Sequence, residues 1–62
     1  MCLSTVYKNE KLDANIAMRT VMQIQCQDGC VILTDLMDRT MAIEGQLVSA
    51  NLVDGFVIVK EC

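Results

Sequence analysis

The sequence predicts an all-β fold, a small antiparallel barrel or curled sheet of about six short strands. Apolar and polar residues alternate in several segments, as they do in half-buried strands. The chain has no proline, and its three glycines, Gly29, Gly45 and Gly55, fall at positions that suit turns. Asp54-Gly55, between two apolar runs, is the clearest of these turn signals.

The first strand is expected over residues 2–7, and the polar stretch 8–11 ends it. A second strand is expected over residues 18–26, because apolar and polar side chains alternate there. Val21 breaks this alternation on the polar face. The apolar face consists of Met18, Met22, Ile24 and Cys26.

Residues 12–22 also carry the apolar spacing of a helix, with Asp13 as a fair N-cap. Ile, Thr and Val in this segment favour a strand, however, and the strand expected at residues 30–35 needs a neighbour to pair with. We therefore predict a strand here and allow a helical turn before it.

A tight loop follows this strand. Gln27-Asp28-Gly29 is predicted to form a three-residue loop closed by a glycine bulge. The return strand covers residues 30–35, and its apolar run 30–33 indicates a strand that is covered on both sides.

Two further short strands are expected at residues 39–44 and 47–52. Asp54-Gly55 then predicts a two-residue type I′ turn, and the last strand begins at Phe56. Residues 1–62 form a single domain, without repeats or linkers.

Length and composition predict association with a second copy. A chain of 62 residues buries only about 60% of the surface that its unfolded form exposes, so its stability is marginal without additional support. Yet 53% of the residues are apolar, and the mean hydropathy is +0.39. Because large exposed apolar patches usually mark interfaces, we expect an obligate homodimer.

The charge of the chain argues against nucleic acid as a partner. The net charge is -3, with eight acidic and five basic residues, whereas nonspecific nucleic-acid binding depends mainly on Lys and Arg. One Tyr and one Phe leave little for base stacking. A small RNA-binding β-barrel module is thus only an alternative to our preferred function. A structural dimeric interaction domain is another alternative.

The sequence also predicts the compartment. The N-terminus shows no charged segment followed by an apolar run, and no apolar run approaches the roughly 20 residues that span a membrane. We expect a cytoplasmic protein with reduced thiols and no membrane partner.

Catalysis finds little support, and we predict that the chain is not an enzyme. It has no histidine to act as a base, no Ser-His-Asp set and no glycine-rich phosphate loop. Two groups of residues with potential chemistry are given structural roles. The acids Asp35, Asp38 and Glu44 are interpreted as a solvated loop rim, and Met18, Met22, Met37 and Met41 as core fillers.

Cys26 and Cys30 flank the predicted hairpin. Cross-strand Cβ atoms lie about 4.5–5.5 Å apart, so the two sulfurs could meet as a redox pair or as half of a zinc site. The CxxxC spacing, without a second Cys pair or a His pair, argues against zinc. We favour two buried small hydrophobes on one face. Cys62, at the end of the chain, is expected to be frayed.

Cys2 is the candidate metal ligand. A thiolate and its own backbone nitrogen close a five-membered chelate ring, and a planar sulfur-nitrogen set suits Ni(II) or Cu(II). One chain supplies two such donors, and two copies together supply four. The alternative is that Cys2 is simply a buried small hydrophobe, because a lone cysteine is a weak metal signal.

Three segments make nearly the whole chain resemble the small CooT-type nickel-binding proteins, accessory factors of nickel insertion into carbon monoxide dehydrogenase. They are the opening Met1-Cys2-Leu3-Ser4-Thr5-Val6-Tyr7, the middle Gly29-Cys30-Val31-Ile32-Leu33-Thr34-Asp35-Leu36 and the closing Val53-Asp54-Gly55-Phe56-Val57-Ile58.

The resemblance implies a single CooT-like β domain in which the cysteine after the initiator methionine binds nickel at a homodimer interface. In this sequence that residue is Cys2. The resemblance thus implies one Ni(II) held between two subunits by the Cys2 thiolates and backbone nitrogens, with a nickel enzyme such as carbon monoxide dehydrogenase as partner. Where Met1 is retained, the nitrogen is the deprotonated Cys2 amide. Three additional cysteines leave open a second site or a shift of ligands.

Overall fold

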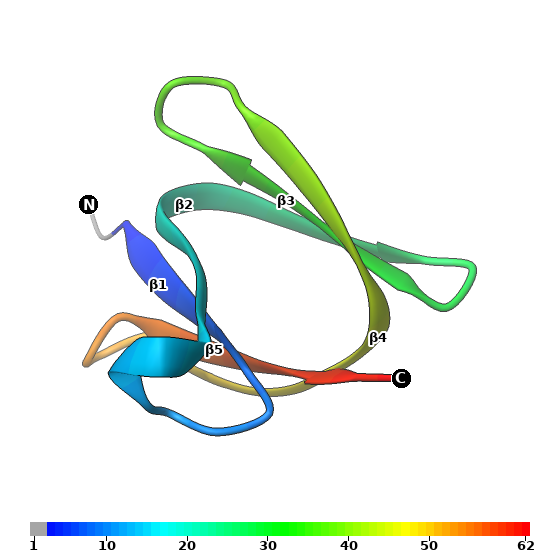
Figure 1. Cartoon of the computed structure of the whole chain (residues 1–62). Helices are drawn as coiled ribbons and strands as arrows, with labels where there is room; N and C mark the ends of the chain where they lie inside the picture. Colours follow the sequence, from blue (N-terminus) through cyan, green and yellow to red (C-terminus); the bar gives the residue numbers. More distant parts are fainter. Residues whose placement is uncertain (1–2) are drawn as a thin grey trace.

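The computed structural model describes residues 3–62 and shows a closed barrel of five strands in the order β1-β2-β3-β4-β5 (Figure 1). The all-β fold class is confirmed, and so is a helical turn before the second strand, the short 3-10 helix η1. The predicted start of the first strand, Cys2, lies outside the described residues. The elements are β1 (Ser4–Lys8), η1 (Asp13–Asn15), β2 (Ile16–Gln27), β3 (Cys30–Asp35), β4 (Thr40–Asn51) and β5 (Phe56–Glu61).

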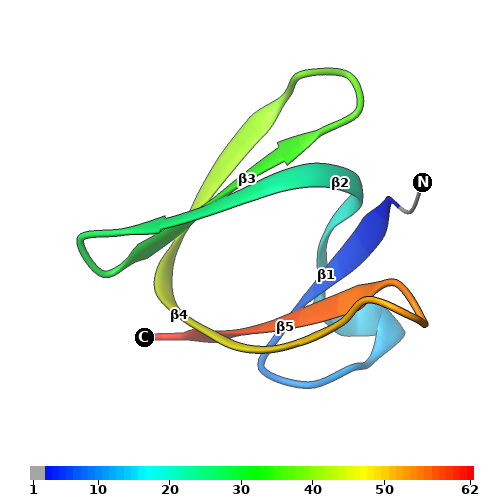
Figure 2. The same cartoon turned by 180° about the vertical axis from the view of Figure 1, so that it is seen from behind.

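The ring closes between its first and last strands. Consecutive strands pair antiparallel, whereas β1 and β5 pair in parallel, from Thr5 opposite Phe56 to Lys8 opposite Val59. The starts of β1 and β5 therefore lie at the same end of the barrel, a relationship that the view from behind also shows (Figure 2).

The two strands predicted at residues 39–44 and 47–52 are one continuous strand, β4, which reduces the expected six strands to five. Gly45 lies within it instead of at a turn. Its φ is +156°, and a Cβ at this position would fall on the carbonyl oxygen of Lys60. Glycine therefore allows β4 to bend closely around β5 while the pairing continues.

Both predicted hairpin loops have the wrong length. Gln27 pairs with Cys30, so the β2–β3 turn contains only Asp28 and Gly29, whose φ values of 50° and 76° are those of a type I′ turn. Between β4 and β5, Asn51 pairs with Phe56, which leaves a longer loop over residues 52–55.

The side chain of Asn51 explains the longer β4–β5 loop. Its Oδ1 accepts hydrogen bonds from the backbone N–H groups of Val53 (3.1 Å) and Asp54 (2.9 Å), and its carbonyl accepts the N–H of Gly55 (2.9 Å). A side chain that supplies turn hydrogen bonds in this way favours a wider loop over a two-residue turn.

The core is small and aliphatic, and it includes one residue that the alternation had placed outside. Thr20 has a φ of 53°, and the β2–β3 register shifts between Val21 and Gln23, so Val21 turns inward and leaves Met22 52% exposed. We predicted that both faces of the apolar run in β3 are covered. Only one face is fully buried, and Cys30, on the other face, is half-buried. The buried hydrophobic residues are Val6, Val21, Val31, Leu33, Ile43, Val57 and Val59.

The methionines are mostly at the surface. Met18 packs against the core, but Met22, Met37 and Met41 are exposed, so the prediction of core fillers is wrong for these three. Met22 lies at the bulge in β2, and Met37 lies in the β3–β4 loop, so neither follows the regular alternation.

Candidate metal site and the barrel end around it

Cys2, the predicted nickel ligand, lies outside the described residues, but the chain that follows it is held firmly. Ser4 pairs with Val21 of β2, and the backbone N–H of Thr5 donates to the carbonyl of Gly55 at 3.0 Å. Because these bonds fix both sides of β1, the start of β1 at Ser4 lies between β2 and the β4–β5 loop.

An open, mainly apolar groove of about 330 Å³ lies at this end of the barrel, and we call it the N-terminal groove. It begins beside Ser4, and the exposed Met22 and Leu52 lie in it. Exposed apolar surface next to the start of the chain is typical of an interface. The remaining lining residues are Val21, Gln23, Ile24, Cys26, Leu47, Ala50 and Val57.

The β4–β5 loop presents two apolar side chains at the same end. Leu52 is 73% exposed and Val53 is 93% exposed. The loop is nevertheless ordered by Asn51, whose Nδ2 donates to Asp54 Oδ2 at 3.1 Å in addition to its backbone contacts. Apolar groups on a preordered loop lose little conformational entropy when a partner covers them.

The hairpin cysteines are not brought together. Cys26 pairs with Val31, and Cys30 pairs with Gln27. Neighbouring residues of a strand point to opposite faces, so the two thiols lie on different faces of the hairpin. Cys26 is exposed and Cys30 is half-buried. The prediction of two buried hydrophobes on one face is therefore wrong, and a redox pair at this hairpin is excluded as well.

Cys62 is exposed, but its backbone is attached to the barrel. Its N–H donates to the carbonyl of Glu44 at 2.9 Å, which corrects the expectation of a frayed end. Glu44 also lies opposite Cys30 in the β3–β4 pairing. Within residues 3–62, even so, no three Cys, Asp or Glu side chains gather closely enough to hold a metal ion.

Asp35 is a residue that the sequence analysis misjudged. We predicted it on a solvated loop rim with Asp38 and Glu44; those two are exposed, but Asp35 is only 1% exposed. Its Oδ1 accepts the backbone N–H groups of Met37 and Arg39, each at 2.9 Å, and its Oδ2 accepts Arg39 Nε at 2.8 Å. An aspartate that ends a strand and precedes a tight loop is the available sequence signal for this role.

These contacts change the acidity of Asp35. The hydrogen bond from the Arg39 backbone N–H, with further help from the Arg39 guanidinium and the Met37 N–H, holds the pKa of this carboxyl below its ordinary value. Burial acts in the opposite direction but is outweighed. Asp35 is thus ionised at neutral pH, and its carboxylate stabilises the loop that follows it by accepting these hydrogen bonds.

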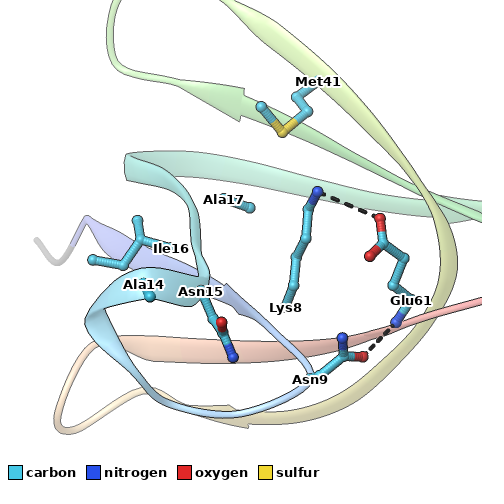
Figure 3. Close-up of a pocket in the computed structure, with 8 residues that line it drawn as sticks. All are labelled: Lys8, Asn9, Ala14, Asn15, Ile16, Ala17, Met41 and Glu61. Carbon is cyan, nitrogen blue, oxygen red and sulfur yellow. Dashed lines mark hydrogen bonds and ion pairs between the residues drawn. The ribbon is translucent and has the colours of Figure 1, made fainter.

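The opposite end of the barrel carries a polar hollow of about 400 Å³ (Figure 3). Lys8 Nζ and Glu61 Oε2 lie 3.4 Å apart across the parallel β1–β5 pair, and Asn9 Oδ1 accepts the Glu61 N–H at 3.0 Å. Both charged side chains are partly exposed, so the ion pair adds little stability. These contacts join the ends of β1 and β5 where the ring closes.

A comparison with models of known protein families identifies the family of this chain. The family model described as CO dehydrogenase accessory protein CooT matches residues 1–60. The chain belongs to the CooT family. The match extends over both Cys2 and the strands of the barrel, and it confirms the resemblance that the sequence predicted. No curated protein matches the chain.

CooT membership ties the chain to carbon monoxide dehydrogenase in an accessory role. In this CooT protein, the part of the chain from residue 3 onward has no helix of the length and apolar character needed to cross a membrane.

Proposed function

We propose that this CooT protein is a nickel-binding accessory protein for the maturation of carbon monoxide dehydrogenase, without catalytic activity of its own. One Ni(II) is held between two copies of the chain by the Cys2 thiolates and backbone nitrogens. The observation that carries the proposal is the match to an accessory protein of carbon monoxide dehydrogenase over residues 1–60, a range that includes Cys2.

The chemistry of the donors favours nickel over oxygen-loving ions. Cys2 offers a soft thiolate beside a backbone nitrogen, and two copies supply two sulfur and two nitrogen donors. A planar set of this kind suits Ni(II) or Cu(II). Residues 3–62 gather no Cys, Asp or Glu cluster that would compete for the ion.

The surface at the N-terminal end of the barrel supports a dimer. A two-fold dimer uses the same patch on both subunits, and the N-terminal groove with its neighbouring Leu52 and Val53 offers apolar area for such a patch. Because β1 starts at this groove, a dimer built on it brings the starts of the two β1 strands, at Ser4 of each copy, toward the symmetry axis.

The experiment that tests this function is a Ni(II) titration of the parent chain and of two matched variants. We expect Cys2→Ser to lose tight Ni(II) binding and the thiolate-to-nickel absorption. Cys62→Ser is the control, because Cys62 is an exposed thiol that does not line the N-terminal groove and its replacement is expected to change stability by no more than about 0.5 kcal/mol. Normal Ni(II) binding by Cys2→Ser, or an equal loss in Cys62→Ser, would contradict the assignment.

A further inference from the structure

We propose that two copies of this protein associate through β2, with residues 22–27 of each copy paired antiparallel into one continuous sheet. The inference rests on the proposed function, because it states how the dimer of that function is formed. The β2–β3 hairpin that carries this segment extends beyond the ring of the barrel, at the right of Figure 1 and at the left of Figure 2.

Along this segment, one edge of β2 has no partner strand among the described residues. β1 pairs with β2 only as far as Ser4 opposite Val21, whereas β2 continues to Gln27. From residue 22 onward, the strand that pairs with β2 is β3, on the other edge. The open edge therefore presents main-chain groups that form a template for an additional strand.

The main-chain groups on the open edge belong to Ile24 and Cys26. Gln27 and Cys30 flank a two-residue turn, and residues beside such a turn form a hydrogen-bonded pair. Residues that bond to the partner strand alternate with residues that do not. Gln25 thus also bonds to β3, and the N–H and C=O groups of Ile24 and Cys26 point to the open edge.

The open edge lacks the side chains that usually keep edge strands apart. Charged residues and proline protect many edge strands, but residues 20–27 include neither. The space beside the edge is open as well, because Met22, Ile24 and Cys26 line the N-terminal groove. Met22 and Cys26 are exposed in the single chain. A strand added to this edge covers them.

A second β2 has the side chains that the added strand requires. That strand must present apolar groups to the groove and polar groups to the outer face, in alternation. β2 alternates in this way, with Met22, Ile24 and Cys26 lining the groove and exposed glutamines between them. Two identical edges related by a two-fold axis pair antiparallel and use the same surface on both subunits. A second copy therefore supplies the matching strand.

The open groups also determine the register of the pairing. When Gln25 of one copy lies opposite Gln25 of the other, Ile24 lies opposite Cys26 of the second copy. Because these two residues carry the open N–H and C=O groups, each of the groups finds a partner in this register. Asp28, the only charged residue in the range 20–34, lies opposite Met22 of the second copy. No like charges therefore face each other across the pair.

The test is disulfide cross-linking of the full chain in which all four native cysteines are replaced by serine. In the proposed register the two copies of Gln25 form a non-hydrogen-bonded pair, with Cα atoms about 4.5 Å apart. A disulfide spans this distance, so Gln25→Cys should give a covalent dimer when diamide oxidises the two thiols. Circular dichroism checks that the fold is retained.

The matched control is Gln23→Cys in the same cysteine-free chain. Position 23 lies opposite position 27 of the second copy, so the two introduced thiols are separated by about 13 Å along the pair. This separation exceeds the reach of a disulfide, and the yield of covalent dimer should be at least about tenfold lower than for Gln25→Cys.

A second measurement uses the parent chain with its other cysteines in place. Cys26→Pro removes one N–H from the open edge without removing a hydrogen bond to β3, and proline is tolerated at such edge positions. It should raise the dimer dissociation constant, measured by sedimentation velocity, at least about tenfold. Cys26→Ser keeps the N–H and should dimerise like the parent.

Three outcomes would overturn the proposal: equal cross-linking of the two glutamine variants, no cross-linking by Gln25→Cys, or parent-like dimerisation of Cys26→Pro. The cross-linked chain lacks Cys2, so its result does not depend on nickel. Cross-linking by Gln25→Cys, combined with a parent that binds no Ni(II), contradicts the proposed function alone. One Ni(II) for every two parent chains, without cross-linking by Gln25→Cys, contradicts the strand pairing alone.

Discussion

The side chain of Asp35 accepts two hydrogen bonds from Arg39, one from its backbone N–H at 2.9 Å and one from Nε at 2.8 Å. Because the same carboxylate also accepts the Met37 N–H, it fixes the whole turn between β3 and β4. A single buried acid therefore holds two exposed apolar side chains in place.

The first prediction concerns pH. The pKa of Asp35 is lowered in the folded chain, chiefly by the Arg39 backbone N–H, so its contribution to stability is present above the unfolded aspartate pKa of about 3.9. That contribution is lost as the pH falls from there through the folded pKa. Thermal unfolding midpoints of the parent and of Asp35→Asn should differ at pH 7 and converge toward pH 2.

The matched control for this prediction is Asp38→Asn, at an exposed position whose φ of 65° asparagine also tolerates. Its unfolding midpoint should follow that of the parent over the whole pH range. A constant gap between the parent and Asp35→Asn down to pH 2 would show that the Asp35 charge contributes nothing to the turn.

The second prediction concerns the bend of β4. Gly45→Ala should lower the free energy of unfolding by about 3 kcal/mol or more, near the upper end for single substitutions, because the new Cβ meets the Lys60 carbonyl. Gly29→Ala is the comparison: its φ of +76° is strained for alanine, but no atom lies within 4 Å of the added Cβ. It should cost about 1–2 kcal/mol. Urea unfolding measures both, and equal losses would contradict the close packing at Gly45.

The third prediction concerns the N-terminal groove. Met22→Ser combined with Leu52→Ser should raise the dimer dissociation constant at least about tenfold, because both side chains are exposed in the single chain and covered in the proposed dimer. Sedimentation velocity at micromolar concentration measures the change. Val48→Ser, an exposed position that does not line the groove, should leave the constant unaltered. A parent chain that is a stable monomer without metal would remove the basis for this interface.

The sequence predicted the fold class because strand formers and turn residues are local signals. It also predicted β3 over residues 30–35, where pairing on both sides agrees with the apolar pattern. The number of strands could not be predicted correctly from the sequence. Gly45 resembles a turn residue in the sequence, and only the approach of the Lys60 backbone shows that it allows a bend.

The candidate site could be predicted only as a residue type and a family resemblance. Cys2 was predicted from the chemistry of a thiolate beside its own amide, and it stays a prediction; the family match includes its position. The N-terminal groove could not be predicted, because the bulge near Val21 exposes Met22 against the simple alternation. The role of Asp35 likewise depends on contacts within a loop whose length the sequence leaves undetermined.

The most direct test of the shared nickel site is one titration of the parent chain with Ni(II), followed by absorption and magnetic measurements between pH 6 and pH 8. We expect one diamagnetic, square-planar ion for every two chains. Its affinity should fall steeply toward pH 6, because thiolates and backbone nitrogens bind only after losing protons and a free thiol has a pKa of about 8.5. One paramagnetic, six-coordinate ion per chain, with little dependence on pH, would contradict the account.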